Sequence, residues 1–272
     1  MKLSKKYAYP YIVWIIIMII VPVFLVFYYS ITAKDNGFTL DNYAKFFSKN
    51  DLLILYKSFK LAFITTVITL LLGYPLAYII SHIRVKYQSM TLLLFIMPMW
   101  INMLLRTYAW QVILSRNGVL NGILAFLNLG QLDLLYTETA VIIGMVYNFI
   151  PFMVLPIYTS ILKVDKSLID AANDLGANKL KVFIKVILPL TVPGIITGII
   201  MVFLPAVSSF TIPKLLGGGD YLLIGSYIEQ QFISTYNWNF GSAISMVIMF
   251  FILLSIFVMK YIDKDSKGAL PW

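Results

Sequence analysis

The sequence predicts an all-α polytopic membrane protein with six transmembrane helices. Hydrophobic residues make up 60% of the 272-residue chain and charged residues only 12%, with a mean hydropathy of +0.87. A soluble domain, by comparison, has about 25% charged residues. The apolar residues also fall into six runs of about 20 residues, the length that a helix needs to cross a bilayer. These runs lack the alternation of barrel strands, so helices are expected.

The six predicted spans are separated by polar segments. The first span follows a basic N-terminus and is too long for the core of a signal peptide, so it is expected to stay in the protein. A short additional helix is predicted at 38–47, with Asp41 as its N-cap. Prolines inside the spans predict bends, because proline removes a backbone N–H. The spans are 11–30, 60–80, 91–113, 138–160, 190–212 and 242–261, and the prolines are Pro98, Pro151, Pro156 and Pro205.

The distribution of Lys and Arg predicts the orientation of the chain. Inner loops of membrane proteins carry an excess of these residues. With the N-terminus inside, the inner segments 1–10, 81–90, 161–189 and 260–272 hold most of the 21 basic residues. Both termini are therefore expected to be cytoplasmic. The net charge of +9 is attributed to loops that face an anionic inner leaflet, and not to nucleic-acid binding.

Several kinds of chemistry lack their residues in this sequence. There is no Cys, and the single histidine, His82, cannot form a His-based metal site by itself. No phosphate-binding G-x-x-x-x-G-K-[ST] loop or nucleophile elbow occurs. The acidic residues lie in loops or at span ends, whereas proton-coupled pumps need one at membrane depth. We therefore predict no catalytic residue, no metal ligand, no cofactor on this chain, and an energy source outside it.

The segment 170–189, DAANDLGANKLKVFIKVILP, is too polar to lie in hydrocarbon. Asp165 can cap a helix that starts just before this segment. Gly176 follows, where a helix end favours a left-handed residue. Asn178 can cap a second helix, which Pro189 is expected to interrupt. The predicted product is a helix, a glycine turn and a second helix.

The first of these helices has one apolar face, because Leu168, Ala171, Ala172 and Leu175 recur at spacings of three or four residues. The two alanines beside a glycine allow another backbone to approach closely. This face therefore suits a groove on another protein. A second interpretation stays open from the residues alone, in which the segment only covers the inner ends of its own helices.

The same segment resembles the EAA motif of ABC-importer permeases. Asp170-Ala171-Ala172, Gly176 and Leu188-Pro189 match the spacing of the motif, with Asp in place of its Glu and Val186 in place of its Ile. The resemblance implies the type I ABC importer permease fold. It also implies a single transmembrane permease domain, residues 1–272, with a cytoplasmic coupling segment at 161–189.

The resemblance further implies the partners of the chain. In this family the motif forms a coupling helix that docks on a separate ATPase subunit, so a dimer of that subunit would hold the ATP and Mg. A second homologous permease subunit, an external substrate-binding protein and membrane lipid complete the expected partners. Asp170 reaches one methylene less far than the Glu of the motif, which affects any salt bridge it would make.

Three longer regions, 92–121, 140–161 and 188–225, resemble the permeases of polyamine importers. That likeness implies a protein of the bacterial cell membrane that forms the translocation path for spermidine or putrescine. Permeases for iron, thiosulfate and other solutes share much of the scaffold and are one alternative. A membrane enzyme, a non-ABC assembly factor or a channel is another. The lack of catalytic groups and of ionisable groups at membrane depth disfavours it.

A polyamine path needs groups that bind a cation, namely acidic groups, carbonyls, hydroxyls or aromatic faces. The aromatic candidates also suit an interfacial belt, and the hydroxyls also suit bonds between helices. Arg106, beside two of the candidates, would repel a polycation and instead suits snorkelling or binding to an external partner. The candidates are Trp100, Asn102, Tyr108, Trp110, Tyr147, Asn148, Ser208, Ser209, Thr211 and Glu229.

Overall fold

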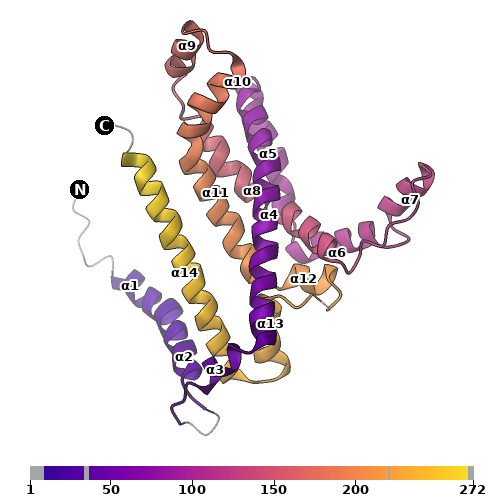
Figure 1. The fold of residues 1–272 in the computed structure, drawn as a ribbon, viewed down its shortest axis with the longest axis vertical. Helices are drawn as coiled ribbons and strands as arrows, with labels where there is room; N and C mark the ends of the chain where they lie inside the picture. Colours follow the sequence, from indigo (N-terminus) through magenta and orange to yellow (C-terminus); the bar gives the residue numbers. More distant parts are fainter. Residues whose placement is uncertain (1–8, 34–36, 220, 269–272) are drawn as a thin grey trace. The chain divides into compact units, whose positions relative to one another are not determined.

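The computed structural model describes residues 9–33, 37–219 and 221–268, and most of these residues are helical (Figure 1). The chain divides into two compact units, residues 1–55 with 227–254 and residues 56–226 with 255–272. The elements in chain order are α1 (Tyr9–Ile15), η2 (Ile16–Ile20), α2 (Val21–Ser30), α3 (Asp41–Phe46), α4 (Lys49–His82), α5 (Val85–Ile96), η3 (Met97–Trp100), α6 (Met103–Leu114), α7 (Val119–Phe126), α8 (Glu138–Ile161), α9 (Lys166–Asp174), α10 (Lys179–Val182), η4 (Phe183–Ile187), α11 (Leu188–Ser208), α12 (Thr211–Leu216), α13 (Ile224–Glu229), η5 (Gln230–Ser234) and α14 (Trp238–Gly268).

Five of the six predicted spans are confirmed as helices long and apolar enough to cross a membrane. Their ends lie up to about a dozen residues from the predicted ones, because polar residues at both ends of the apolar runs continue the helices. These helices comprise Val13–Ser30, Lys49–His82, Glu138–Ile161, Lys179–Ser208 and Trp238–Val258. The helix predicted at 38–47 also forms, as α3. Asp41 is its first residue and not its N-cap, which is Leu40.

The third predicted span, 91–113, is wrong as a single straight helix. The chain bends by 89° between Val85–Trp100 and Met103–Phe126. Pro98 lies in the 3-10 turn η3, and Ile101 and Asn102 then take extended backbone conformations. The side chain of Asn102 accepts a hydrogen bond from the Leu104 N–H at 2.8 Å and so starts a new helix, α6. A proline and a capping residue four positions apart therefore convert one apolar run into two helices.

In the unit formed by residues 1–55 and 227–254, two asparagine amides close the C-terminal end of α2. The Asn42 amide donates to the carbonyls of Ser30 and Thr32 at 3.4 and 3.0 Å. The Asn239 amide donates to the carbonyls of Thr32 and Tyr29 at 2.7 and 3.2 Å. The last carbonyls of a helix have no partner within the helix, so these amides attach α3 and α14 to the end of α2.

The same unit holds a buried carboxylate, Asp51, in the first turn of α4. Ser48 donates a hydrogen bond to it at 2.9 Å, and Tyr227 forms a second one. Burial together with the Asp51 carboxylate raises the pKa of Tyr227 to about 12. The phenol therefore keeps its proton at neutral pH and donates a hydrogen bond to the Asp51 carboxylate.

In the unit formed by residues 56–226 and 255–272, α8 and α11 pack along most of their length (Figure 1). Two glycines of α11 allow the close approach. A Cβ at Gly194 would lie 2.5 Å from the Ser160 Cβ and 2.7 Å from the Pro156 carbonyl oxygen, and one at Gly198 would lie 2.7 Å from the Met153 sulfur. Small residues four apart on one face are typical of contacts between membrane helices.

Aromatic rings connect α4 to the start of α11. The Tyr74 and Tyr78 rings meet the Phe183 ring edge-on, at 5.6 and 5.4 Å between centroids. The Thr191 hydroxyl donates to the Leu188 carbonyl at 3.0 Å, so it accepts the proton of the Tyr74 hydroxyl at 2.9 Å. Packed rings and one buried hydrogen bond therefore link η4 and the start of α11 to α4.

Pro189 does not interrupt the second helix of the 170–189 segment, contrary to the prediction from sequence. The chain is helical from Lys179 to Ser208. The wider π turn η4 ends at Ile187, with the Leu188 N–H bonded to the Phe183 carbonyl, and Pro189 is the second residue of α11. In the first turn of an α-helix a proline ring is tolerated, and the π turn places Pro189 in that position.

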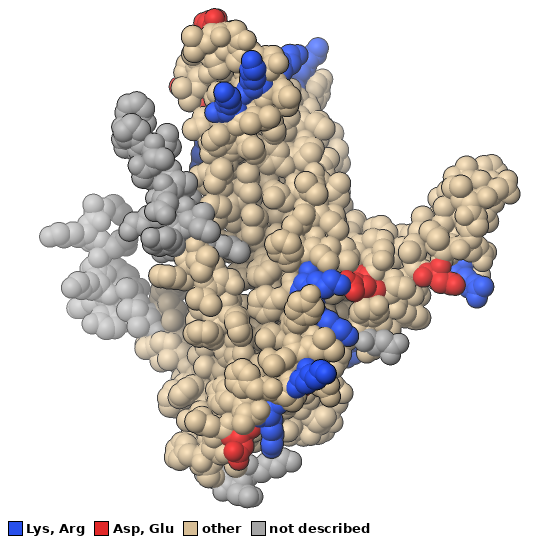
Figure 2. Space-filling view, viewed as in Figure 1, with Lys and Arg blue, Asp and Glu red and all other residues tan. Residues whose placement is uncertain are grey.

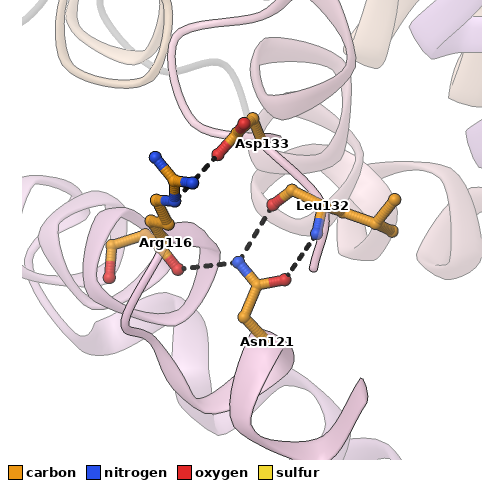
Figure 3. Close-up of polar contacts among 5 residues, drawn as sticks. Arg116, Asn121, Leu132 and Asp133 are labelled. Atoms are coloured by element: carbon orange, nitrogen blue, oxygen red, sulfur yellow. Dashed lines mark hydrogen bonds and ion pairs between the residues drawn. The ribbon is translucent and has the colours of Figure 1, made fainter. Parts of the chain in front are cut away.

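Residues 116–133, which include α7, form an arm that ends in a closed loop (Figure 3). Asn121 is buried and makes three hydrogen bonds. Its amide donates to the carbonyls of Ser115 and Leu132 at 3.2 and 2.9 Å, and its oxygen accepts from the Leu132 N–H at 2.8 Å. Arg116 and Asp133 face each other across the base of the loop at 3.8 Å, both largely exposed. The loop is therefore held by Asn121 more than by the ion pair.

Replacing Asn121 by alanine is expected to open this loop, because the carbonyl and N–H of Leu132 lose their partner. The expected cost in local stability is about 2 kcal/mol. Limited proteolysis of the purified protein measures it, with faster cleavage between residues 116 and 133 as the expected result. Asn117→Ala, an exposed amide on the same arm, is the matched control. Equal cleavage rates for the two variants would contradict this role of Asn121.

Candidate functional site

The candidate site is the hairpin formed by α9, a glycine turn and α10, which lies at one end of α4 and α11 (Figure 1). Both predicted caps are confirmed. The Asp165 carboxylate accepts from the Ser167 N–H at 2.9 Å, and the Asn178 side chain accepts from the Lys181 N–H at 2.9 Å. The bond from the Ser167 backbone lowers the pKa of Asp165 below its usual value of 3.8. The ionised carboxylate therefore stabilises the start of α9 at neutral pH.

Asp165→Ala is expected to loosen α9 at neutral pH. Hydrogen exchange in residues 166–174 should be roughly fivefold faster than in the wild-type protein. The pKa of Asp165 is lower in the folded protein, so its contribution is present above the unfolded pKa and is lost as the pH falls through the folded value. The difference between variant and wild type should therefore shrink as the pH falls below the usual value of 3.8 and vanish once the carboxyl is protonated in the folded protein. Asp174→Ala, in the last turn, is the control, and a difference that persists in acid would contradict the capping role.

The turn between α9 and α10 is a Schellman motif. Gly176 has the left-handed φ of +77° that the sequence predicts. The Ala177 N–H bonds the Ala172 carbonyl at 3.0 Å and the Gly176 N–H bonds the Asn173 carbonyl at 2.8 Å. Ala172 thus supplies a backbone acceptor to the turn as well as a small side chain. These bonds fix the angle between the two helices.

The α9 helix has two differently used faces. Ile169 and Asn173, four residues apart, face a groove of about 670 Å³. The end of α4 and the α10–η4 segment form its other walls. Leu168, Ala171 and Leu175 point away from this groove, and the exposed fractions of the two leucines are 47% and 89%. Acidic and basic side chains surround the exposed end of the hairpin (Figure 2). This chain therefore leaves an apolar face with a charged rim uncovered on α9.

The remaining motif residues lie around this face. Asp170 is exposed on α9, and Ala172 is half-buried at the edge of the turn. Leu188 and Pro189 lie in the first turn of α11, on the far side of the π turn η4. Asp170 therefore lies on the exposed side of the hairpin, whereas Leu188 and Pro189 connect the hairpin to a membrane span.

The residues predicted to line a substrate path do not form one cluster, and the first group lies on or next to α6. Trp110 and Tyr147 meet edge-on, with ring centroids 5.4 Å apart, and line one groove with Arg106. Asn102 uses its side-chain oxygen as the cap of α6. Trp100 and Tyr108 are exposed, by 78% and 49%.

The other candidates are polar side chains on α8, on α13 and around the α11–α12 junction. Asn148 and Ser209 are buried, and the Asn148 Oδ1 and the Ser209 hydroxyl have no hydrogen-bond partner among the described residues. The Ser208 hydroxyl donates to the Leu204 carbonyl at 3.1 Å, and Thr211 is the half-buried first residue of α12. Glu229 ends α13, in the unit that contains residues 227–254.

Sequence reasoning missed the residues that connect the hairpin to the spans. These are the Tyr74, Tyr78 and Phe183 rings and the glycines at 194 and 198. The glycines carried a readable signal, because two small residues four apart in an apolar run favour close helix packing. The ring cluster carried none, since aromatic residues are frequent throughout this chain.

Comparison with known proteins identifies the family. The model of the family described as "Binding-protein-dependent transport system inner membrane component" matches residues 1–268. The chain belongs to this family. It is therefore a multi-pass protein of the bacterial inner membrane. Its architecture is that of the type I importer permeases.

Curated relatives resemble this permease over most of its length. It is 41% identical to the spermidine/putrescine transport system permease protein PotB of Haemophilus influenzae, over 92% of this chain and 91% of that protein. It is 39% identical to PotB of Escherichia coli K12, over 91% and 92%.

Solved structures share the fold of this permease. A bacterial ABC transporter that imports alginate has a chain with TM-score 0.79 at 16% identity, covering 97% of both chains. The MetNI methionine ABC transporter, in an inward-facing conformation, has one with TM-score 0.61 at 15% identity, covering 80% of this chain and 99% of that one.

Proposed function

We propose that this chain is the permease subunit of an ATP-driven importer that moves polyamines such as spermidine and putrescine into the cell. The observation that carries the proposal is the uncovered apolar face of α9, formed by Leu168, Ala171 and Leu175 and held at a fixed angle by the Gly176 turn. The polyamine class rests on the relatives named as spermidine/putrescine permeases, at about 40% identity over almost the whole chain.

In this proposal the outward face of α9 docks on a separate ATPase subunit, one of a dimer that holds ATP and Mg. Both termini and the segment 161–189 are then cytoplasmic. Closure of the ATPase tilts the hairpin as a rigid body. The tilt passes through η4 to α11 and, through Phe183 and Tyr74, to α4. Asp170, beside the docking face, is the residue for a charged contact with the ATPase.

The translocation path is proposed to lie between this chain and a second homologous permease subunit, with substrate delivered by an external binding protein. The two units of the chain act together as one permease domain. Among the path candidates, the hydroxyls of Ser208 and Thr211 are the proposed contacts for a cation, because Trp110 and Tyr147 line a groove that already holds Arg106. Weak contacts suit a path, since the cargo must leave it again.

Transport by the assembled complex in proteoliposomes tests the function. The complex is reconstituted with its ATPase and binding protein, and labelled spermidine uptake is measured with ATP, without ATP, and with excess thiosulfate, iron or putrescine as competitors. ATP-dependent uptake that putrescine alone suppresses is the expected result. Uptake of thiosulfate or iron in place of spermidine would contradict the assignment of polyamines as the substrate class. Uptake without any ATPase would refute the importer assignment.

A further inference from the structure

Arg106 occupies a groove that its own unit does not complete. The groove, of about 290 Å³, lies on α6 beside α8. The Arg106 Nε is buried and has no hydrogen-bond partner among the described residues. The walls are apolar and aromatic, and consist of Ile101, Leu105, Ala109, Trp110, Ile113 and Tyr147.

A guanidinium in such surroundings needs a counterion. It has five N–H donors, and its positive charge cannot be removed by loss of a proton. A charged side chain within an apolar span is costly and is normally paired or faces a cavity. A carboxylate suits this groove, because it fits the planar N–H fork of arginine in a bidentate manner.

The described acids of the same unit do not supply this carboxylate. Glu138 pairs with Lys60 at 2.9 Å, and Asp133 faces Arg116 at 3.8 Å. Asp165, Asp170 and Asp174 belong to the α9–α10 hairpin, beyond the far end of α8. A polyamine cannot supply it either, since its ammonium groups would be repelled. No described acid from residue 56 to residue 219 therefore pairs with Arg106.

The surroundings of Arg106 favour a membrane-embedded partner. Ile101 and Leu105 are 53% and 63% exposed, and the next turns of α6 continue this apolar surface with Val112, which is 65% exposed. One charge within an apolar surface is typical of the centre of an interface between chains. A soluble binding protein would meet the loops, whereas α6 belongs to a bent pair of helices that together are long and apolar enough to cross a membrane.

We infer that the Arg106 groove is a contact surface for the second permease subunit, which inserts a carboxylate side chain between Trp110 and Leu105 to pair with the guanidinium. This inference rests on the proposed function, because the second subunit is part of it. It assigns Arg106 to assembly of the two permeases and not to the substrate.

Co-purification of the two permease subunits tests the inference. Both are co-expressed with the ATPase, this chain is tagged, and the amount of second permease recovered per tagged chain is measured in detergent. Arg106→Gln and Arg106→Glu are each expected to lower the recovery by about tenfold or more, because the carboxylate of the partner is left buried without its cation. Arg106→Lys should lie between these variants and the wild type. Arg116→Glu, an exposed arginine of the same unit, is the matched control and should change nothing.

The outcomes of this experiment distinguish failure of the Arg106 inference from failure of the proposed function. Normal recovery with Arg106→Gln, at a normal yield of folded tagged chain, overturns the inference even if uptake falls, since Arg106 would then act on substrate or on the binding protein. Failure of the wild-type chain to bring down a second permease overturns the proposed function, and the inference with it.

As a second readout, acidic residues of the second permease are changed to lysine one at a time in the Arg106→Glu background. Restored recovery for one of them is expected, and no restoration at any of them contradicts a direct ion pair.

Discussion

Replacing Gly176 by valine is expected to abolish ATP-driven uptake while the chain stays folded in the membrane. Gly176 has a φ of +77°, and no atom lies within 4 Å of the position that a Cβ would occupy. The effect is therefore backbone strain and not a clash. A β-branched residue in the left-handed region costs roughly 1–3 kcal/mol. The turn is therefore expected to open, and its two backbone hydrogen bonds to break. The angle between α9 and α10 is then lost, and the hairpin can no longer transmit a rigid tilt.

Uptake and ATP hydrolysis in proteoliposomes measure this uncoupling. We expect spermidine uptake to fall by at least about tenfold, and substrate-stimulated ATP hydrolysis to fall with it, at a normal melting temperature. Gly130→Val is a closely matched control, because Gly130 has a φ of +76° and equally open surroundings but lies on the arm. Equal losses for the two variants would show that strain anywhere, and not the hairpin angle, is responsible.

Replacing Gly194 by leucine is expected to prevent stable folding. The added side chain would start 2.7 Å from the Pro156 carbonyl oxygen and 2.5 Å from the Ser160 Cβ, and the backbone oxygen cannot move aside as a flexible side chain does. Separation of α8 from α11 would undo the central helix pair of this unit. The expected loss of stability is at least about 3 kcal/mol.

Thermal unfolding in detergent and the yield of monodisperse protein measure this loss. Gly122→Leu provides the control, because Gly122 also lies in a helix and nothing lies within 4 Å of its Cβ position. Gly122→Leu should leave the melting temperature within about 2 °C of the wild type. A Gly194→Leu protein that melts at the wild-type temperature would contradict the close α8–α11 contact.

Much of the helical architecture and the shape of the α9–α10 hairpin could be predicted from the sequence, because both depend on local signals. Apolar runs of bilayer length specify the spans. Asp165, Asn178 and Gly176 each act within four residues of their own position, so caps and turn are readable without knowledge of contacts.

The errors in the prediction arose where two local signals compete. At 91–113 hydropathy favours one span, but Pro98 and the capping Asn102 end one helix and start another. At Pro189 the ring favours a break, but the π turn before it keeps the helix continuous. At the start of α3 the residue type favours Asp41 as the N-cap, but the N-cap position is occupied by Leu40, one residue earlier.

The grouping of distant residues could not be predicted, because it depends on packing. Trp110 meets Tyr147, and Tyr74 meets Thr191, across 37 and 117 positions of sequence respectively. No period or spacing connects such pairs. The same holds for the buried Nε of Arg106, whose lack of a partner becomes visible only when its neighbours are in place.

The central claim is that the outward face of α9 docks on the ATPase, and site-specific cross-linking tests it most directly. The chain has no cysteine, so Ala171→Cys introduces a single site for a photoactivatable maleimide in the assembled, transport-active complex. Ala125→Cys, an exposed alanine on α7, serves as the control. We predict a cross-link to the ATPase subunit from position 171 and none from position 125. A transport-active complex in which position 171 labels no ATPase would contradict the docking of this face.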